Sequence, residues 1–138
     1  MSLTSMLEAA ARGGTVEIVD GWTQGRAIYG GLTGALLLAS IKGRLREIAG
    51  DGTGVAAPHP LRSFTVSFIG PATTGPVEVR AEVLRVGKNV TQCQATLRQD
   101  GALVATALAA FGKHRESTIS VAPRHPMPEL PDPESIEP

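Results

Sequence analysis

The chain has 138 residues and a mass of 14.3 kDa; 42% of the residues are hydrophobic and 19% are charged, which favours one globular domain. Lysine and arginine together number 13, as do aspartate and glutamate, so bulk charge argues against nucleic-acid binding. Cys93 is the single cysteine, which excludes an internal disulfide framework and a cysteine-rich zinc site and suits a reducing compartment.

The N-terminal residues show no secretory signal, because they lack a basic start followed by an apolar stretch and a cleavage site. The longest uncharged run, residues 27–41, is shorter than the ~20 residues needed to cross a bilayer. We therefore expect a cytoplasmic protein with no membrane span.

The first elements are predicted from local patterns. Residues 5–8 have the spacing of a capping box, which predicts a short helix that begins there and ends at the two glycines 13–14. Residues 15–19 alternate apolar and polar side chains and are expected to form a strand, and residues 20–21 mark a turn. Whether residues 22–29 continue the strand is open at this point.

A long helix is predicted from Gly31 to about Ile48. Its apolar side chains cover most of its circumference, and cations appear only in the C-terminal half, where they suit the negative end of the helix dipole. About 18 residues at 1.5 Å each give roughly 27 Å, enough to cross a whole sheet. A helix that is apolar nearly all round has to be enclosed, so we expect a sheet to enclose it.

Four strand-like runs with a period of two follow a proline-rich break at residues 58–60. Asp100-Gly101 is a tight-hairpin signal, and glycine-containing turns occur at residues 70–76 and 87–89. Short connections favour antiparallel neighbours. The predicted layout is one strand, a long buried helix and an antiparallel meander built from residues 64–68, 77–83, 93–97 and 103–111.

The last 22 residues hold 6 of the 10 prolines and four acidic side chains. Such a composition favours an extended tail or linker over a packed element. We therefore predict a folded domain over residues 1–116 and a proline-rich tail or linker over residues 117–138.

Three segments, in the right order and at plausible spacing, resemble the TesB-like acyl-CoA thioesterase family: GRAIYGG at residues 25–31, LRSFTVSFIGP at 61–71 and LRVGKN at 84–89. The resemblance covers about residues 20–111 and is to the N-terminal half of enzymes that carry two fused repeats. It implies an α+β hot-dog fold, with an antiparallel sheet wrapped around one long central helix. It also implies pairing, either as a homodimer or with a second hot-dog repeat.

The same resemblance implies hydrolysis of the thioester of a fatty or aryl acyl-CoA, with coenzyme A as part of the substrate and no other cofactor. Thioester hydrolysis needs hydrogen-bond donors where the carbonyl oxygen becomes an oxyanion. Backbone amides at the start of the long helix would supply them, and glycine allows close approach. The candidate donors are Gly30, Gly31 and Leu32; the alternative is that the glycine pair only permits a tight strand-to-helix turn.

The group that would activate water is missing from the expected position, since no Asp or Glu occurs between Asp20 and Glu47. In the family, the catalytic aspartate, hydroxyl residue and glutamine lie in the second repeat, and the matching positions here are the apolar Leu32, Leu61 and Ala109. The chain is therefore expected to complete an acyl-binding cleft for a catalytic partner. The alternative is a non-catalytic acyl-CoA binding or assembly half.

The candidate substrate contacts other than Tyr29 lie at the glycine turn that corresponds, in many hot-dog proteins, to a region near the coenzyme A phosphates. A solvated hairpin turn is the alternative, and an aromatic residue beside the helix start can equally be a core or interface side chain. No histidine pair has metal-ligand spacing on one helix face, so no metal site is expected, and His59, His114 and His125 are interpreted as surface residues. The candidate contacts are Tyr29, Arg85, Gly87, Lys88 and Asn89.

Overall fold

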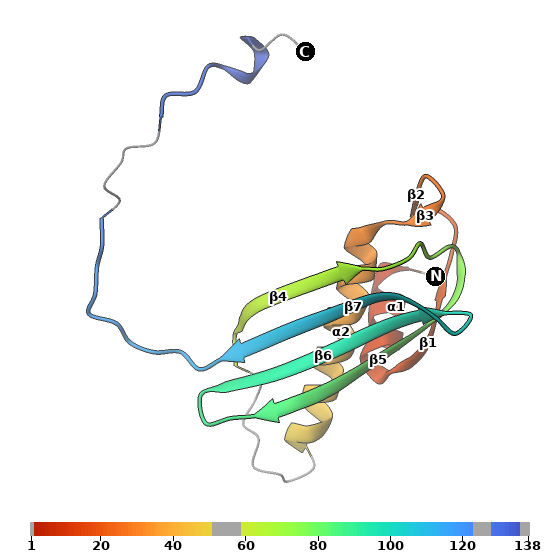
Figure 1. Cartoon of the computed structure of the whole chain (residues 1–138), viewed down its shortest axis with the longest axis horizontal. Coiled ribbons are helices and arrows are strands. Elements are labelled where there is room, and N and C mark those ends of the chain that lie inside the picture. Colours follow the sequence, from red (N-terminus) through yellow and green to blue (C-terminus); the bar gives the residue numbers. More distant parts are fainter. Residues whose placement is uncertain (1, 51–58, 123–127, 136–138) are drawn as a thin grey trace.

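The computed structural model describes residues 2–50, 59–122 and 128–135 (Figure 1). Part of the proline break at residues 58–60 therefore lies outside the described residues. Within these ranges the secondary-structure elements, in chain order, are α1 Leu3–Arg12, β1 Gly14–Ile18, β2 Thr23–Gln24, β3 Ala27–Ile28, α2 Gly30–Gly50, β4 Leu61–Phe68, β5 Gly75–Val86, β6 Val90–Gln99, β7 Ala102–Gly112 and the 3-10 turn η1 Pro133–Ser135.

One antiparallel sheet carries the fold, with the strand order β1-β5-β6-β7-β4. Helix α2 lies across one face of it, chiefly over β5 and β6, and α1 packs beside α2 and against β1 (Figure 1). The expected α+β arrangement of a sheet around one long helix is confirmed.

The core lies between α2 and the inner face of the sheet. In β6, Cys93, Ala95 and Leu97 are at most 1% exposed, because alternate strand residues point toward the helix. Leu36 and Ile41 of α2 are completely buried against them. The predicted period-two patterns therefore place the inner face of this strand correctly.

Strand β4 has a different neighbour from the one the meander predicts. Strands β5, β6 and β7 do form a meander, but β4 pairs with β7 at the far edge, and β1 takes the edge beside β5. The connection from β4 to β5 crosses the end of the sheet, where the amides of Ile69 and Gly70 donate to the carbonyl of Val104 and the carbonyl of Ala72 accepts from Ile28. These hydrogen bonds to distant residues satisfy backbone groups of the β4–β5 connection. From its local sequence alone, this connection resembles an ordinary turn.

The predicted start of α1 at Ser5 is wrong. The helix begins at Leu3, and Ser2 is its N-cap: the Ser2 hydroxyl oxygen accepts from the Ser5 amide at 3.2 Å. Ser5 instead donates its hydroxyl to the Ser2 carbonyl at 2.9 Å. The predicted end is confirmed, since Gly13 stops the helix with a φ of 73° and donates its amide to Ala10.

Residues 22–29, for which the sequence pattern favours no single structure, contain β2 and β3, which form a separate two-stranded hairpin. The long helix starts directly after it, one residue earlier than expected, at Gly30. Beyond β7, residues 113–122 and 128–132 carry no helix or strand. The role of residues 117–138 as a tail or linker stays a prediction. Among the described residues, no helix is long and apolar enough to span a membrane.

Candidate active site at the start of α2

The first turn of α2 is fixed by backbone hydrogen bonds around Tyr29. The Tyr29 amide donates to the carbonyl of Trp22 at 2.8 Å, and the Tyr29 carbonyl accepts from Leu32 at 3.0 Å and Thr33 at 3.2 Å. The amide of Leu32, one of the three donors predicted, is therefore already engaged inside the helix. Gly30 and Gly31 precede the first intrahelical bond, so their amides point out of the positive end of the helix dipole.

Two aromatic rings lie on these glycines. The ring of Phe68 faces Gly30 so closely that a Cβ on this glycine would stand 3.2 Å from the ring, and the ring of Tyr29 occupies the space where a side chain on Gly31 would start. Both rings keep large exposed fractions, 62% for Phe68 and 52% for Tyr29. The glycine pair thus allows two aromatic walls to stand directly over the helix start.

A pocket of about 320 Å³ opens at the same place, between the helix start, the β2–β3 hairpin and the β4–β5 connection. Gln24 and Thr33 contribute its polar side chains, and Thr33 is only 2% exposed. No Asp, Glu or His is among the described residues that line it. The full lining is Gln24, Ala27, Ile28, Gly30, Thr33, Phe68, Gly70, Pro71, Ala72 and Val104.

This arrangement can bind and polarise a carbonyl compound. The apolar lining suits a hydrocarbon group, and two amides at a helix N-terminus suit a developing oxyanion. Among the described residues that line the pocket, no side chain can act as a general base for water.

Phe68 and the polar pair of the pocket were missed by sequence reasoning. Strand alternation places Phe68 on the inner face with Phe64 and Val66, yet it is the most exposed of the three, because β4 ends there. The signal that could have found it is its position at the end of a strand directly before the Gly70-Pro71 turn.

The predicted substrate contacts at the β5–β6 turn lie at the other end of the sheet. Phe68 of β4 and Leu97 of β6 both pair with Ala105 of β7, so they lie at the same end of the sheet. Val90, at the β5–β6 turn, is seven residues from Leu97 along β6, a distance of about 23 Å. Gly87 closes the turn by donating its amide to Val90 at 2.9 Å, while Arg85, Lys88 and Asn89 are exposed. Within one chain the structure therefore does not bring these residues to Tyr29 and the glycine amides.

Of the three positions that match the catalytic set of the resembled family, Leu61 and Ala109 lie on the neighbouring strands β4 and β7, and Leu32 lies on α2. Leu32 is buried in the first turn of α2, Ala109 pairs with Phe64 in the middle of the sheet, and Leu61 begins β4 opposite Phe111. None of the three side chains is polar, so these positions supply no acid, base or nucleophile.

Cys93 and the described histidines, His59 and His114, do not line the pocket at the start of α2. Burial raises the pKa of the Cys93 thiol to about 11, so this thiol is protonated at neutral pH and is a poor nucleophile. No group of three or more His, Cys, Asp or Glu able to hold a metal occurs in the described part of the chain. His59 is half-buried, His114 is exposed and His125 lies outside the described residues.

A comparison with known protein families identifies the family of the chain. The model of the acyl-CoA thioesterase N-terminal domain family matches residues 18–112, which include the glycine pair and strands β4 to β7. This chain belongs to that family. No curated protein matches the chain.

Solved structures share this fold over most of the chain. A candidate thioesterase from Ralstonia eutropha, described as related to phenylacetic acid degradation, is 31% identical over 70% of each chain with a TM-score of 0.62. A hot-dog protein of unknown function from Alicyclobacillus acidocaldarius is 27% identical over 89% of this chain and 42% of its own, with a TM-score of 0.61. These likenesses confirm the expected hot-dog fold.

A third structure, a candidate thioesterase II from Thermobifida fusca, is 29% identical over 83% of this chain and 40% of its own, with a TM-score of 0.57. The family domain described here therefore spans about two-fifths of the length of the Alicyclobacillus and Thermobifida proteins.

Proposed function

We propose that the chain is the acyl-binding unit of a TesB-like acyl-CoA thioesterase that acts on fatty or aryl acyl-CoA, and that hydrolysis needs a second hot-dog unit. The observation that carries the proposal is a largely apolar pocket of about 320 Å³ that Gly30 lines at the start of α2, next to Gly31, in a chain of the acyl-CoA thioesterase family. The cytoplasmic location expected from the sequence stays a prediction.

Each part of the site has a defined role in this proposal. The amides of Gly30 and Gly31 hold the thioester carbonyl oxygen and stabilise its negative charge when water attacks the carbonyl carbon. The rings of Tyr29 and Phe68 and the apolar lining hold the acyl group and exclude bulk water. Water adds to the carbonyl carbon, the carbon–sulfur bond breaks, and coenzyme A leaves as the free thiol.

The second unit is required because the described lining of the pocket offers no group that takes the proton from water. Either a second copy or a second repeat would provide it. An unpaired sheet edge at β4 supports pairing, and so does the greater length of two of the similar proteins. In the paired arrangement we propose that Arg85, Lys88 and Asn89 hold coenzyme A phosphates at a site shared between units.

The alternative function is a non-catalytic acyl-CoA binding or assembly half. The apolar residues Leu32, Leu61 and Ala109 favour it, because they stand where the family's catalytic set would stand. The two functions differ in turnover by the assembled protein, not in binding by this chain.

Calorimetry and thiol release together test the proposal. We expect the 138-residue chain to bind acyl-CoA without turnover, and Phe68→Ala to weaken binding about ten-fold, equivalent to roughly 1.4 kcal/mol of lost apolar contact. Leu108→Ala is the matched control, because Leu108 is similarly exposed, at 57%, and lies outside the pocket.

Robust turnover by the chain alone would show that a catalytic set is present after all. Absence of acyl-CoA binding would contradict both candidate functions. Turnover only after addition of a second hot-dog unit would separate the thioesterase from the assembly half.

A further inference from the structure

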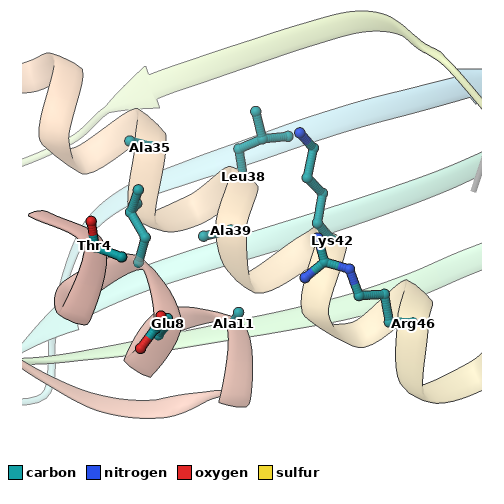
Figure 2. A pocket seen from close by; sticks show the side chains of 9 residues that line it. Thr4, Glu8, Ala11, Ala35, Leu38, Ala39, Lys42 and Arg46 are labelled. Atoms are coloured by element: carbon teal, nitrogen blue, oxygen red, sulfur yellow. The ribbon is translucent and has the colours of Figure 1, made fainter.

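A second groove lies between α1 and α2, on the side of α2 that faces away from the sheet (Figure 2). Its volume is about 410 Å³, and it shares no lining residue with the pocket at the start of α2. The floor is apolar and half-buried, and two exposed cations, Lys42 and Arg46, stand one turn apart on α2. The lining residues are Thr4, Leu7, Glu8, Ala11, Ala35, Leu38, Ala39, Lys42 and Arg46.

Neither cation has an anionic partner in the part of the chain that the structure describes. Among the described residues the ion pairs are Arg44 with Glu47 and Arg80 with Glu78, and neither involves the groove. Glu8 contributes the carboxylate of the lining, but it forms no ion pair with Lys42 or Arg46. The groove therefore combines an apolar floor with uncompensated positive charge at one end.

The complementary charge lies in the C-terminal segment. Residues 1–116 contain 12 basic and 9 acidic side chains, a net charge of +3, whereas residues 117–138 contain 1 basic and 4 acidic side chains, a net charge of −3. The two values cancel to the zero net charge of the whole chain. All four acidic side chains fall after residue 128 and have no basic residue among them. They are Glu129, Asp132, Glu134 and Glu137.

This segment also offers an apolar side chain, and its hydrogen bonds among the described residues are local. Leu130 is 70% exposed, and the hydrogen bonds around η1 join Glu134 and Ser135 to Asp132. Three prolines in residues 128–133 restrict the free segment, so less conformational freedom is lost when it binds.

The connection is long enough to reach the groove. Lys113 and Glu129 are separated by 16 residues, which can span up to roughly 50 Å when extended. That reach exceeds the length of α2, about 32 Å for its 21 residues. Covalent attachment supplies a high effective concentration, so even weak contacts populate a bound state.

We propose that residues 128–135 bind in the α1–α2 groove of their own chain, with acidic side chains at Lys42 and Arg46 and Leu130 on the apolar floor. Two cations four residues apart present separate charges along the helix, which fits several carboxylates in sequence better than the single head group of a fatty acid. The proposal is independent of the proposed thioesterase function and of whatever follows residue 138.

Paramagnetic broadening in the full chain tests the contact. A nitroxide is attached to Ser135→Cys, with mass spectrometry checking that buried Cys93 is unlabelled, and amide signals are compared before and after reduction of the label. We expect loss of signal intensity for residues 4–11 and 35–46. Lys42→Glu with Arg46→Glu should abolish the loss, and 0.5 M salt should weaken it because the ion pairs are exposed.

The matched control is Arg26→Glu with Lys88→Glu, which changes the net charge equally at two exposed turn residues outside the groove. This control should keep the broadening. A second variant, with Glu129, Asp132 and Glu134 all changed to Gln, should lose it without touching the folded domain.

Four results would overturn the proposal. Broadening that is absent from the groove removes the contact, and broadening that survives reversal of both groove charges removes its electrostatic basis. Broadening seen only between an isotope-labelled chain and a separate nitroxide-labelled chain moves the contact to a second copy. Dodecanoate shifts at the groove amides without any broadening from residue 135 assign the groove to a free amphiphile.

Discussion

Gly43 is the residue on which the packing of the two helices depends most directly. A Cβ at this position of α2 would overlap the backbone carbonyl of Ala11 in α1. Backbone atoms cannot move aside as a side-chain end can, so the helices would have to separate. Both helices contribute to the groove that we assign to the C-terminal segment, and their spacing sets its shape.

Gly43→Ala should destabilise the domain by roughly 2 kcal/mol, because forced overpacking outweighs the gain in helix propensity. Gly34→Ala is the matched control in the same helix, since its Cβ would meet Phe64 and Val66 at an ordinary 3.9 Å. The control should be neutral or more stable by up to about 1 kcal/mol. Urea unfolding of the two variants measures the difference, and equal stabilities would contradict the close approach.

The buried thiol of Cys93 leads to a prediction about the pH dependence of the free energy of unfolding. Burial raises the pKa of its thiol from the usual 9.0 to about 11 in the folded state. The unfolded state therefore loses this proton first, so the free energy of unfolding should fall between about pH 9 and 11, by roughly 2–3 kcal/mol at most.

Cys93→Ala should remove this part of the alkaline decline while leaving the contributions of other groups in place. Thermal unfolding of both proteins at pH 8 to 11 makes the comparison. An identical alkaline slope in the two proteins would show that the thiol is not protected by burial.

At the scale of single elements, α1 depends on a cap that the sequence pattern did not identify. Ser2→Ala removes the hydroxyl oxygen that accepts from the Ser5 amide, and should cost about 1 kcal/mol. Ser5→Ala keeps that amide and should cost less. Differential scanning calorimetry of the two variants distinguishes the caps, and a larger loss for Ser5→Ala would restore the capping box at residues 5–8.

Element types were predictable because they follow from local periodicity. The long helix and the strands from residue 61 to residue 112 were placed to within a few residues by their patterns. The position of β4 was not predictable in this way, because a strand's neighbour is decided by competition between distant edges. The local pattern of residues 61–74 does not indicate that β4 will pair with the free edge of β7.

The residues of the candidate site also divide into those that local sequence predicts and those that only the fold brings together. Gly30 and Gly31 could be proposed from the sequence because a glycine pair before an apolar helix has a local explanation in helix-terminus chemistry. Tyr29 could be proposed as the aromatic residue beside them. Phe68 joins them only through the fold, which brings the end of β4 against the first turn of α2. The separation of Arg85 and Lys88 from that point also follows from strand register, which the sequence pattern leaves open.

At the scale of the whole molecule, the sheet is unfinished on the β4 side. Strand β4 has one neighbour, and its inner-face residues Phe64 and Val66 are only half-buried. At the end of the same strand, Phe68 and Ile69 are 62% and 55% exposed. An open strand edge beside exposed apolar side chains is a surface that proteins normally cover.

We therefore expect the chain to associate through the β4 side, and Phe68→Lys to shift it toward monomer because a charge would be buried in the contact. Leu108→Lys is the control: Leu108 is 57% exposed, but it lies on β7 and faces away from α2. Sedimentation velocity at micromolar concentration should show a dimer for the unmodified chain and the control, and a larger monomer fraction for Phe68→Lys. A strictly monomeric unmodified chain would rule out self-pairing and leave a second hot-dog repeat as the unit that completes the site.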